Sequence, residues 1–137
     1  KLKEQKINLY TLLNFEMLGV PFIDRDYEVF PTGYELSNLG DKLNAYTNST
    51  LFGRSDVATK YNLFSRSDNY SFYTQFKVPC HTISSCDLTN FDFYHHVDDE
   101  IDKFDSAFMA EIINKLIPGI IKICNTYSKE IKMYETN

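Results

Sequence analysis

Apolar and aromatic residues follow one another with few interruptions over residues 6–19, "KINLYTLLNFEMLG", and the run stops at Gly19 and Pro21. A nearly continuous apolar run bounded in this way is typical of a strand that is buried on both faces of a sheet. We therefore predict a buried strand over 6–19.

The next segments alternate between the two kinds of secondary structure. Short apolar runs predict strands, and a 3.6-residue spacing or a Ser/Asp start signal predicts helices. The predicted strands cover 26–33 and 78–85, and the predicted helices cover 34–47 and 67–76.

A long amphipathic helix is predicted in the last third of the chain, after the acidic residues at 98–100. Asp105 or Ser106 is suited to cap its N-terminus, and Pro118 is expected to kink it near its middle. Two adjacent apolar rows run along it: Phe104, Phe108, Ile112 and Leu116 in one, and Met109, Ile113, Ile117 and Ile120 in the other. The mixture of strands and helices predicts a layered α/β fold, with residues 1–137 as a single domain.

Composition narrows the possible classes of function. The 137 residues are 43% hydrophobic and carry a formal charge of -5, with no cluster of Lys or Arg, which argues against nucleic-acid binding. No apolar run reaches the roughly 20 residues that a membrane span needs. Three cysteines without a CxxC spacing argue against a disulfide framework or a structural zinc site, so Cys80 and Cys86 are predicted to be buried.

Two stretches carry candidate chemistry. In "FYHHVDDE", residues 93–100, a histidine beside carboxylates is compatible with a metal site, but acidic residues also favour the start of a helix. From this stretch alone the helix start is the favoured interpretation. Glu16 is the only charged residue from Ile7 to Ile23, and a buried carboxylate costs several kcal/mol unless a cation or metal meets it. That favours a functional role for Glu16, whereas the lone His81 in a predicted strand is favoured as a core histidine.

Four motifs occur in a fixed order: "NFEMLG", "RSDNYSFY", "VPCHTISS" and "FYHHVDDEIDKFD". Together they resemble the second half of the catalytic domain of the di-zinc aminopeptidase family, from about residue 8 to residue 116. That family includes bacterial leucyl aminopeptidases, glutamate carboxypeptidase, glutaminyl cyclases and the transferrin receptor. The resemblance implies that the chain is the C-terminal part of a three-layer α/β/α zinc-exopeptidase fold with a mixed sheet.

The resemblance also implies roles for single residues. His95 matches a zinc ligand, and Glu16 matches an acidic ligand of the other zinc. Tyr94 matches a position that contacts the substrate and hydrogen-bonds the developing oxyanion. Asp99 is expected to orient the loop that holds His95, and Asp68 to act beside the metal or in the substrate pocket.

The chain departs from the family pattern at several positions. Glu16 replaces the commoner Asp, His96 replaces a threonine and gains no role, and the proline that would stiffen the turn after His95 is absent. The family's first-half residues, a histidine ligand, a bridging aspartate and a Glu-Glu pair, have no counterpart here. Since the chain also begins without Met or a signal peptide, we expect it to be processed or to be a piece of a longer protein. The N-terminal half of the catalytic domain is then the expected partner of this chain.

The resemblance therefore implies a zinc-dependent exopeptidase, an aminopeptidase that hydrolyses peptides with the help of two zinc ions. Nucleic acid is not expected as a partner, and no membrane span is expected. Alone, the chain is expected to lack the general base and to be inactive. Two alternatives stay open: a receptor or interaction domain that has lost the metals, and a glutaminyl cyclase. Relatives are often exported, which favours a periplasmic or extracellular location.

Overall fold

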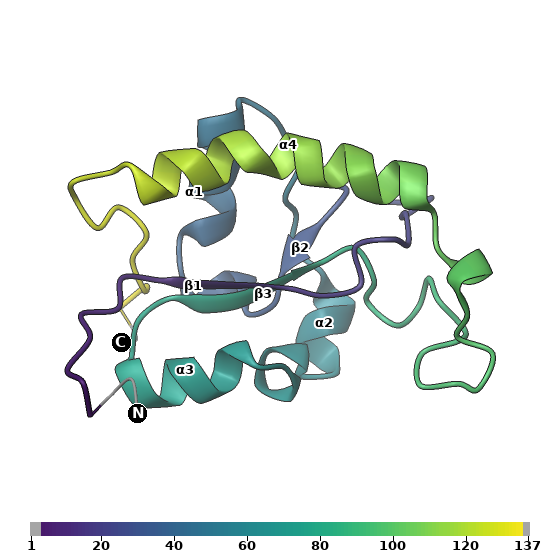
Figure 1. Cartoon of the computed structure of the whole chain (residues 1–137), viewed down its shortest axis with the longest axis horizontal. Helices are drawn as coiled ribbons and strands as arrows, with labels where there is room; N and C mark the ends of the chain where they lie inside the picture. Colours follow the sequence, from purple (N-terminus) through teal and green to yellow (C-terminus); the bar gives the residue numbers. More distant parts are fainter. Residues whose placement is uncertain (1–3, 136–137) are drawn as a thin grey trace.

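A mixed sheet with helices packed against it forms the body of the molecule (Figure 1). The computed structural model describes residues 4–135. The strands are β1 (Leu12–Phe15), β2 (Phe30–Pro31) and β3 (Cys80–Ser84). The α-helices are α1 (Leu39–Thr47), α2 (Asp56–Lys60), α3 (Asn69–Phe76) and α4 (Ser106–Cys124), and the 3-10 helices are η1 (Tyr34–Leu36), η2 (Leu63–Arg66) and η3 (Ile101–Lys103).

Strand β3 is the centre of the sheet, which has the order β1-β3-β2. It pairs in parallel with β1 and antiparallel with β2, and all five of its residues are buried. Helices α1 and α4 lie on one face of the sheet, and α3 lies on the other (Figure 1). The predicted α/β class is confirmed, while the wider three-layer fold stays a prediction.

The prediction of a strand buried on both faces over 6–19 is wrong for the structure described. Only Leu12–Phe15 form a strand, and none of these four residues is buried. Strand β1 lies at the edge of the sheet, where it has β3 as its partner on one side. Because β3 is itself only five residues long, it limits how far β1 extends.

The other predicted elements are confirmed to different extents. Residues 26–33 form a strand only at Phe30–Pro31, since proline has no N–H to give to a longer ladder. The helix predicted over 34–47 is divided into η1 and α1, while α3 and β3 lie within the ranges predicted for them. Helix α2 was not predicted; Ser55 caps it by accepting a hydrogen bond from the Ala58 amide.

Helix α4 begins after Asp105, whose carboxylate accepts a hydrogen bond from the Phe108 amide at 2.9 Å. Asp105 is therefore the cap among the two predicted candidates. The helix continues through Pro118 to Cys124. Within the described part of the chain, no helix is long and apolar enough to span a membrane.

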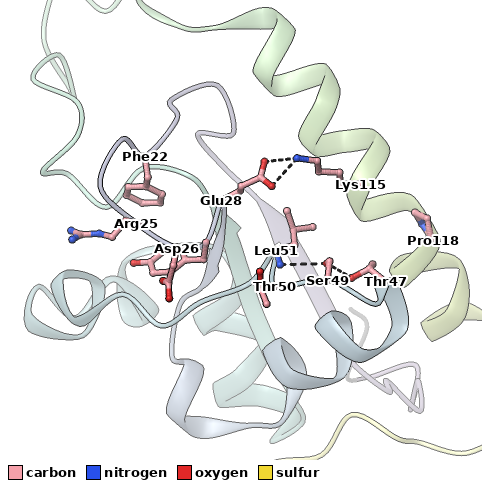
Figure 2. A pocket seen from close by; sticks show the side chains of 11 residues that line it. Phe22, Arg25, Asp26, Glu28, Thr47, Ser49, Thr50, Leu51, Lys115 and Pro118 are labelled. Atoms are coloured by element: carbon pink, nitrogen blue, oxygen red, sulfur yellow. Dashed lines mark hydrogen bonds and ion pairs between the residues drawn. The ribbon is translucent and has the colours of Figure 1, made fainter.

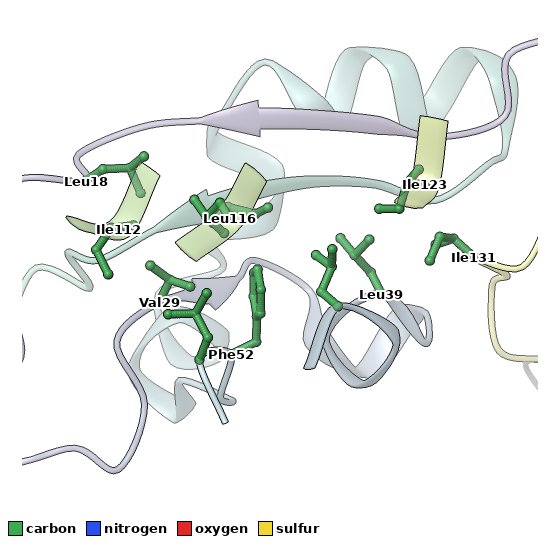
Figure 3. Packing of buried hydrophobic residues seen from close by; sticks show 11 residues of the cluster. Leu18, Val29, Leu39, Phe52, Ile112, Leu116, Ile123 and Ile131 are labelled. Carbon is green, nitrogen blue, oxygen red and sulfur yellow. The ribbon is translucent and has the colours of Figure 1, made fainter. Parts of the chain in front are cut away.

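The main core lies between the sheet and helices α1 and α4 (Figure 3). Gly119 lets these helices approach closely, because a Cβ at this position would lie 2.9 Å from the Leu43 side chain. The segment after α4 returns to the same core, where Ile131 is buried. The labelled core residues in Figure 3 are Leu18, Val29, Leu39, Phe52, Ile112, Leu116, Ile123 and Ile131.

His81 is a buried histidine with both ring nitrogens hydrogen-bonded, as predicted for a core position. Nδ1 lies 2.7 Å from the Thr32 carbonyl oxygen, and Nε2 lies 2.7 Å from the Ser37 hydroxyl. The carbonyl can only accept, so Nδ1 carries the proton and Nε2 of the neutral ring accepts from Ser37. Burial lowers the pKa of His81 below its ordinary value of 6.5.

Folding stability is expected to fall as the pH drops below about 6.5. The unfolded state binds a proton on His81 in this range while the folded state resists it, so the folded form loses stability as acidity increases. Urea unfolding of residues 1–137 at pH 7.5, 6.5 and 5.5 tests this. A His81→Leu variant should be less stable at pH 7.5 and show a smaller decline. Stability that is constant or rises between pH 6.5 and 5.5 would contradict the assignment.

Candidate functional site

Glu16 directly follows β1, and its backbone amide donates to the Ile83 carbonyl at 3.1 Å, which continues the pairing with β3. Its carboxylate accepts two hydrogen bonds from neutral side chains. The Asn14 amide donates to Oε1 at 2.7 Å, and the Ser67 hydroxyl donates to Oε2 at 3.1 Å. The carboxylate is thus held by dipoles, and each oxygen retains lone pairs for a further partner.

Glu16 and Tyr94, from distant parts of the chain, line one small cavity of about 30 Å³. Its wall also includes Arg66 and Ser67, which lie just before α3, and Ser84 at the end of β3. The cavity therefore forms where the carboxyl ends of the parallel strands β1 and β3 meet. Open α/β sheets bind their ligands at this edge.

A second cavity of about 240 Å³ is also lined by Tyr94. Asp99 contributes to its wall, but most of the lining is apolar. The lining residues are Met17, Leu18, Gly19, Val20, Phe91, Tyr94, Asp99, Phe104 and Met109. Tyr94 and Met17 belong to both cavities, so the apolar cavity adjoins the one that contains Glu16.

His95 is exposed, and its ring stacks on Tyr94 with 4.0 Å between the ring centroids. Asp68 is also exposed; it precedes α3 but its side chain does not cap the helix. The structure thus brings Glu16 to Tyr94 and Tyr94 to Asp99, with His95 adjacent, while Asp68 lines neither cavity. The roles of these five residues stay predictions.

The donor atoms in the described residues fit part of a zinc site. Carboxylate oxygen and imidazole nitrogen, as in Glu16 and His95, are ordinary zinc ligands, but a catalytic zinc needs about three protein ligands. Across residues 4–135, no group of three or more His, Cys, Asp or Glu side chains is placed to hold a metal ion. Glu16 and His95 therefore supply donor types that fit part of such a site.

Among the described residues, three of the seven non-glycine residues with a left-handed backbone lie at or beside the Glu16 cavity. Met17, Leu88 and His95 have φ angles of 50°, 75° and 58°, which are unfavourable for residues other than glycine. Met17 and Leu88 line the cavity, and His95 follows Tyr94. Strained backbone of this kind concentrates at functional sites, where the surrounding structure fixes it.

The loop after β3, which leads towards Tyr94 and His95, is held by a buried carboxylate that the sequence analysis missed. The Asp87 side chain is fully buried and accepts hydrogen bonds from the hydroxyls of Ser55, at 3.0 Å, and Thr89, at 2.5 Å. The Arg25 guanidinium lies 3.6 Å from Oδ2 of Asp87, the oxygen that also accepts from Ser55. The sequence signal was the "DLTN" turn, because a short acidic side chain often bonds the backbone two residues later, as Asp87 does with the Thr89 amide.

A larger cavity of about 500 Å³ lies beside α4 and contains none of the predicted site residues (Figure 2). Lys115 on its wall donates to both carboxylate oxygens of Glu28 at 2.7 Å and pairs with Glu111 at 2.6 Å. Because this lysine is already paired with two carboxylates, it does not present an uncompensated charge to a ligand. Volume alone therefore does not identify this cavity as the site.

Comparison with known proteins gives one match. The sequence model for Peptidase family M28 matches residues 2–118, which include all five predicted site residues. The match extends to Pro118, so it also covers the sheet and most of α4. Searches of curated proteins and of solved structures gave no match.

Arg25→Met is expected to lower the free energy of unfolding by more than about 1 kcal/mol, the upper end for exposed ion pairs, because it removes the cation beside the buried Asp87 carboxylate. The matched control is Arg54→Met. Arg54 pairs with Asp56 at the surface, where such pairs contribute about 0–1 kcal/mol. Urea unfolding of both variants gives the comparison. Equal losses in the two variants would show that Arg25 does not stabilise the loop.

Proposed function

Because the chain belongs to peptidase family M28, we propose that it is the C-terminal part of the catalytic domain of a zinc-dependent aminopeptidase. Family membership implies a zinc-dependent peptidase. The observation that carries the finer assignment is the shared cavity of Glu16 and Tyr94 at the carboxyl edge of the sheet. In the proposed three-layer fold, the sheet described above is part of a wider mixed sheet.

Glu16 and His95 are the proposed zinc ligands, one for each of two ions. Bound zinc would supply a Lewis acid and a water of lowered pKa. Tyr94 lines the cavity of Glu16 and its ring stacks on His95, so its hydroxyl is suited to donate to a developing oxyanion. Asp99 would orient the loop of His95, and Asp68 is assigned a supporting role near the substrate.

The apolar cavity beside Tyr94 is proposed to take the side chain of the substrate's N-terminal residue. Its volume of about 240 Å³ and its Met, Leu and Phe lining suit a large apolar side chain. Asp99 in its wall and Glu16 in the adjoining cavity carry negative charge that would attract the free α-amino group of the substrate. This combination favours removal of N-terminal residues over cleavage within a peptide.

The missing zinc ligands are proposed to arrive on a segment that pairs with the outer edge of β1. In the parallel ladder, Leu12 and Asn14 pair towards β3, which leaves the backbone groups of Leu13 and Phe15 directed outwards. An apolar groove of about 340 Å³ lies between α4 and residues 15–18, at the end of β1. Exposed strand edges and apolar patches of this kind mark interaction surfaces.

The groove also explains the exposed apolar row of α4. Ile113 and Ile117 are 42% and 43% exposed, although they alternate with buried core residues of the same helix. Both line the groove together with Phe15, which is 40% exposed. A strand and its side chains placed here would bury all three. We call the polypeptide that contains this chain and that segment the intact enzyme.

In the intact enzyme, His95→Ala is expected to abolish peptide hydrolysis and to remove about one zinc equivalent, because it deletes a direct ligand. His96→Ala is the matched control, since His96 is equally exposed and instead contacts Asp98 at 3.3 Å. It should retain zinc and most activity. Zinc content and hydrolysis of an aminoacyl anilide are measured side by side. Unchanged zinc content and turnover in His95→Ala would refute its assignment as a zinc ligand. If the unaltered protein neither binds zinc nor hydrolyses the anilide, the receptor-like alternative is favoured instead.

Residues 1–137 alone are expected to bind zinc weakly and to hydrolyse no aminoacyl substrate, because they lack the bridging carboxylate and the general base. Zinc titration and the same anilide assay test the chain against the intact enzyme. Adding the upstream segment as a separate polypeptide should restore activity if it docks at β1. Zinc-dependent turnover by residues 1–137 alone would contradict the proposed division of the site.

A further inference from the structure

We propose that Thr82 and Asn69 are positioning residues that fix the Glu16 carboxylate through Asn14, an inference that rests on the proposed function of Glu16 as a zinc ligand. The three residues form a continuous set of hydrogen bonds, which we call the amide network. Asn14 lies on β1, Thr82 on β3 and Asn69 at the start of α3. The network therefore connects Glu16 to the interior of the molecule.

The direction of every hydrogen bond in the amide network is set at its buried end. The Asn69 side-chain nitrogen lies 3.1 Å from both the Phe64 and the Cys80 carbonyl oxygens. Backbone carbonyls only accept, so the NH₂ group of Asn69 must face them and its Oδ1 must face Thr82. The Thr82 hydroxyl accordingly donates to Asn69 Oδ1, at 2.9 Å.

This direction is transmitted to Glu16. Because the Thr82 hydroxyl has given its only hydrogen to Asn69, it can only accept from Asn14, whose side-chain nitrogen lies 3.1 Å away. The NH₂ group of Asn14 is therefore turned towards Thr82, and its second hydrogen points to Glu16 Oε1 at 2.7 Å. The orientation that presents a donor to Glu16 thus agrees with the one fixed at the buried end of the network by the backbone carbonyls of Phe64 and Cys80.

Burial makes the amide network rigid. Asn69 is 0% exposed and Thr82 is 1% exposed, so water does not compete for their hydrogen bonds. In such surroundings an unpaired polar group is costly, and a fully paired network holds one arrangement. A glutamate has three rotatable side-chain bonds, and hydrogen bonds to both of its oxygens reduce that freedom before a metal binds. Removing a residue that orients a metal ligand in this way typically weakens metal binding about 10–100-fold.

Thr82→Val in the intact enzyme is the test, because valine keeps the shape of threonine but removes the hydroxyl. We expect about a tenfold weaker apparent zinc affinity in chelator competition, from loss of the orienting partner. The visible spectrum of the Co²⁺-substituted protein should also change. Thr82→Ser keeps the hydroxyl and should restore both properties. Ser37→Ala is the matched control: it removes another buried hydroxyl, bonded to His81 on the same strand, and should lower stability without altering zinc affinity.

The Thr82 variants decide the proposal, and Glu16→Gln separates its failure from failure of the proposed function. Weaker zinc binding in Thr82→Val with restoration in Thr82→Ser supports it. Wild-type zinc affinity and Co²⁺ spectrum in Thr82→Val, with stability lowered as in Ser37→Ala, overturns it. Glu16→Gln is measured beside them: if it weakens zinc binding while Thr82→Val does not, the network fails but the ligand assignment stands. If Glu16→Gln also binds zinc normally, the proposed function itself fails.

A second measurement applies if Thr82→Val does not fold. Hydrogen exchange of the side-chain NH₂ groups is followed by NMR in the unaltered, metal-free intact enzyme. The Asn69 and Asn14 groups should exchange at least about tenfold more slowly than that of the exposed Asn48, because their hydrogens are committed to buried or half-buried acceptors. Exchange of Asn14 as fast as that of Asn48 would overturn the proposal.

Discussion

The parallel pairing of β1 with β3 is the interaction on which the site depends. It places Asn14 beside Thr82 and brings Glu16 to the end of β3. A slip of one residue would turn every β1 side chain to the opposite face of the sheet. The Asn14–Thr82 hydrogen bond would then be lost, and Glu16 would no longer face Ser67. Backbone pairing and side-chain pairing therefore select the same register.

Elements whose signals are local could be predicted from the sequence, and elements that depend on a distant partner could not. Helix α4 has a long apolar period and a cap at Asp105, both of which are visible within a few residues. The lengths of β1 and β2 are instead set by what pairs with them. The apolar run over 6–19 is suited to a strand with a neighbouring strand on each side. Within the described residues, β1 has such a neighbour, β3, on one side. An apolar sequence with half-exposed side chains is thus consistent with a strand that has a second neighbour in the intact enzyme.

The candidate site was predictable to the extent that its residues are unusual in sequence. Glu16 is a single charge in an apolar stretch, and Tyr94, His95 and Asp99 belong to one short motif. Asn14, Thr82 and Asn69 also lie in the quoted motifs, but nothing there indicates that they bond one another, because threonine and asparagine are common in strands and at helix starts. Their partners are determined by tertiary register, and so the hydrogen bonds appear only when β1, β3 and α3 are placed together. The pairing of Asp87 with Arg25 was hidden for the same reason.

Glu16 is held by neutral donors, and this has a consequence for how the proposed site assembles. A lysine or arginine in place of Asn14 and Ser67 would compete with zinc for the carboxylate, whereas hydrogen-bond donors orient it and leave its charge available. Under the proposed assignment, a zinc ion would compensate that charge, and its remaining ligands would come from the segment at the β1 edge. Zinc binding and docking of that segment would then be coupled, and each would strengthen the other by the same free energy. The amide network would contribute to this coupling by holding the Glu16 carboxylate in place before the remaining ligands arrive.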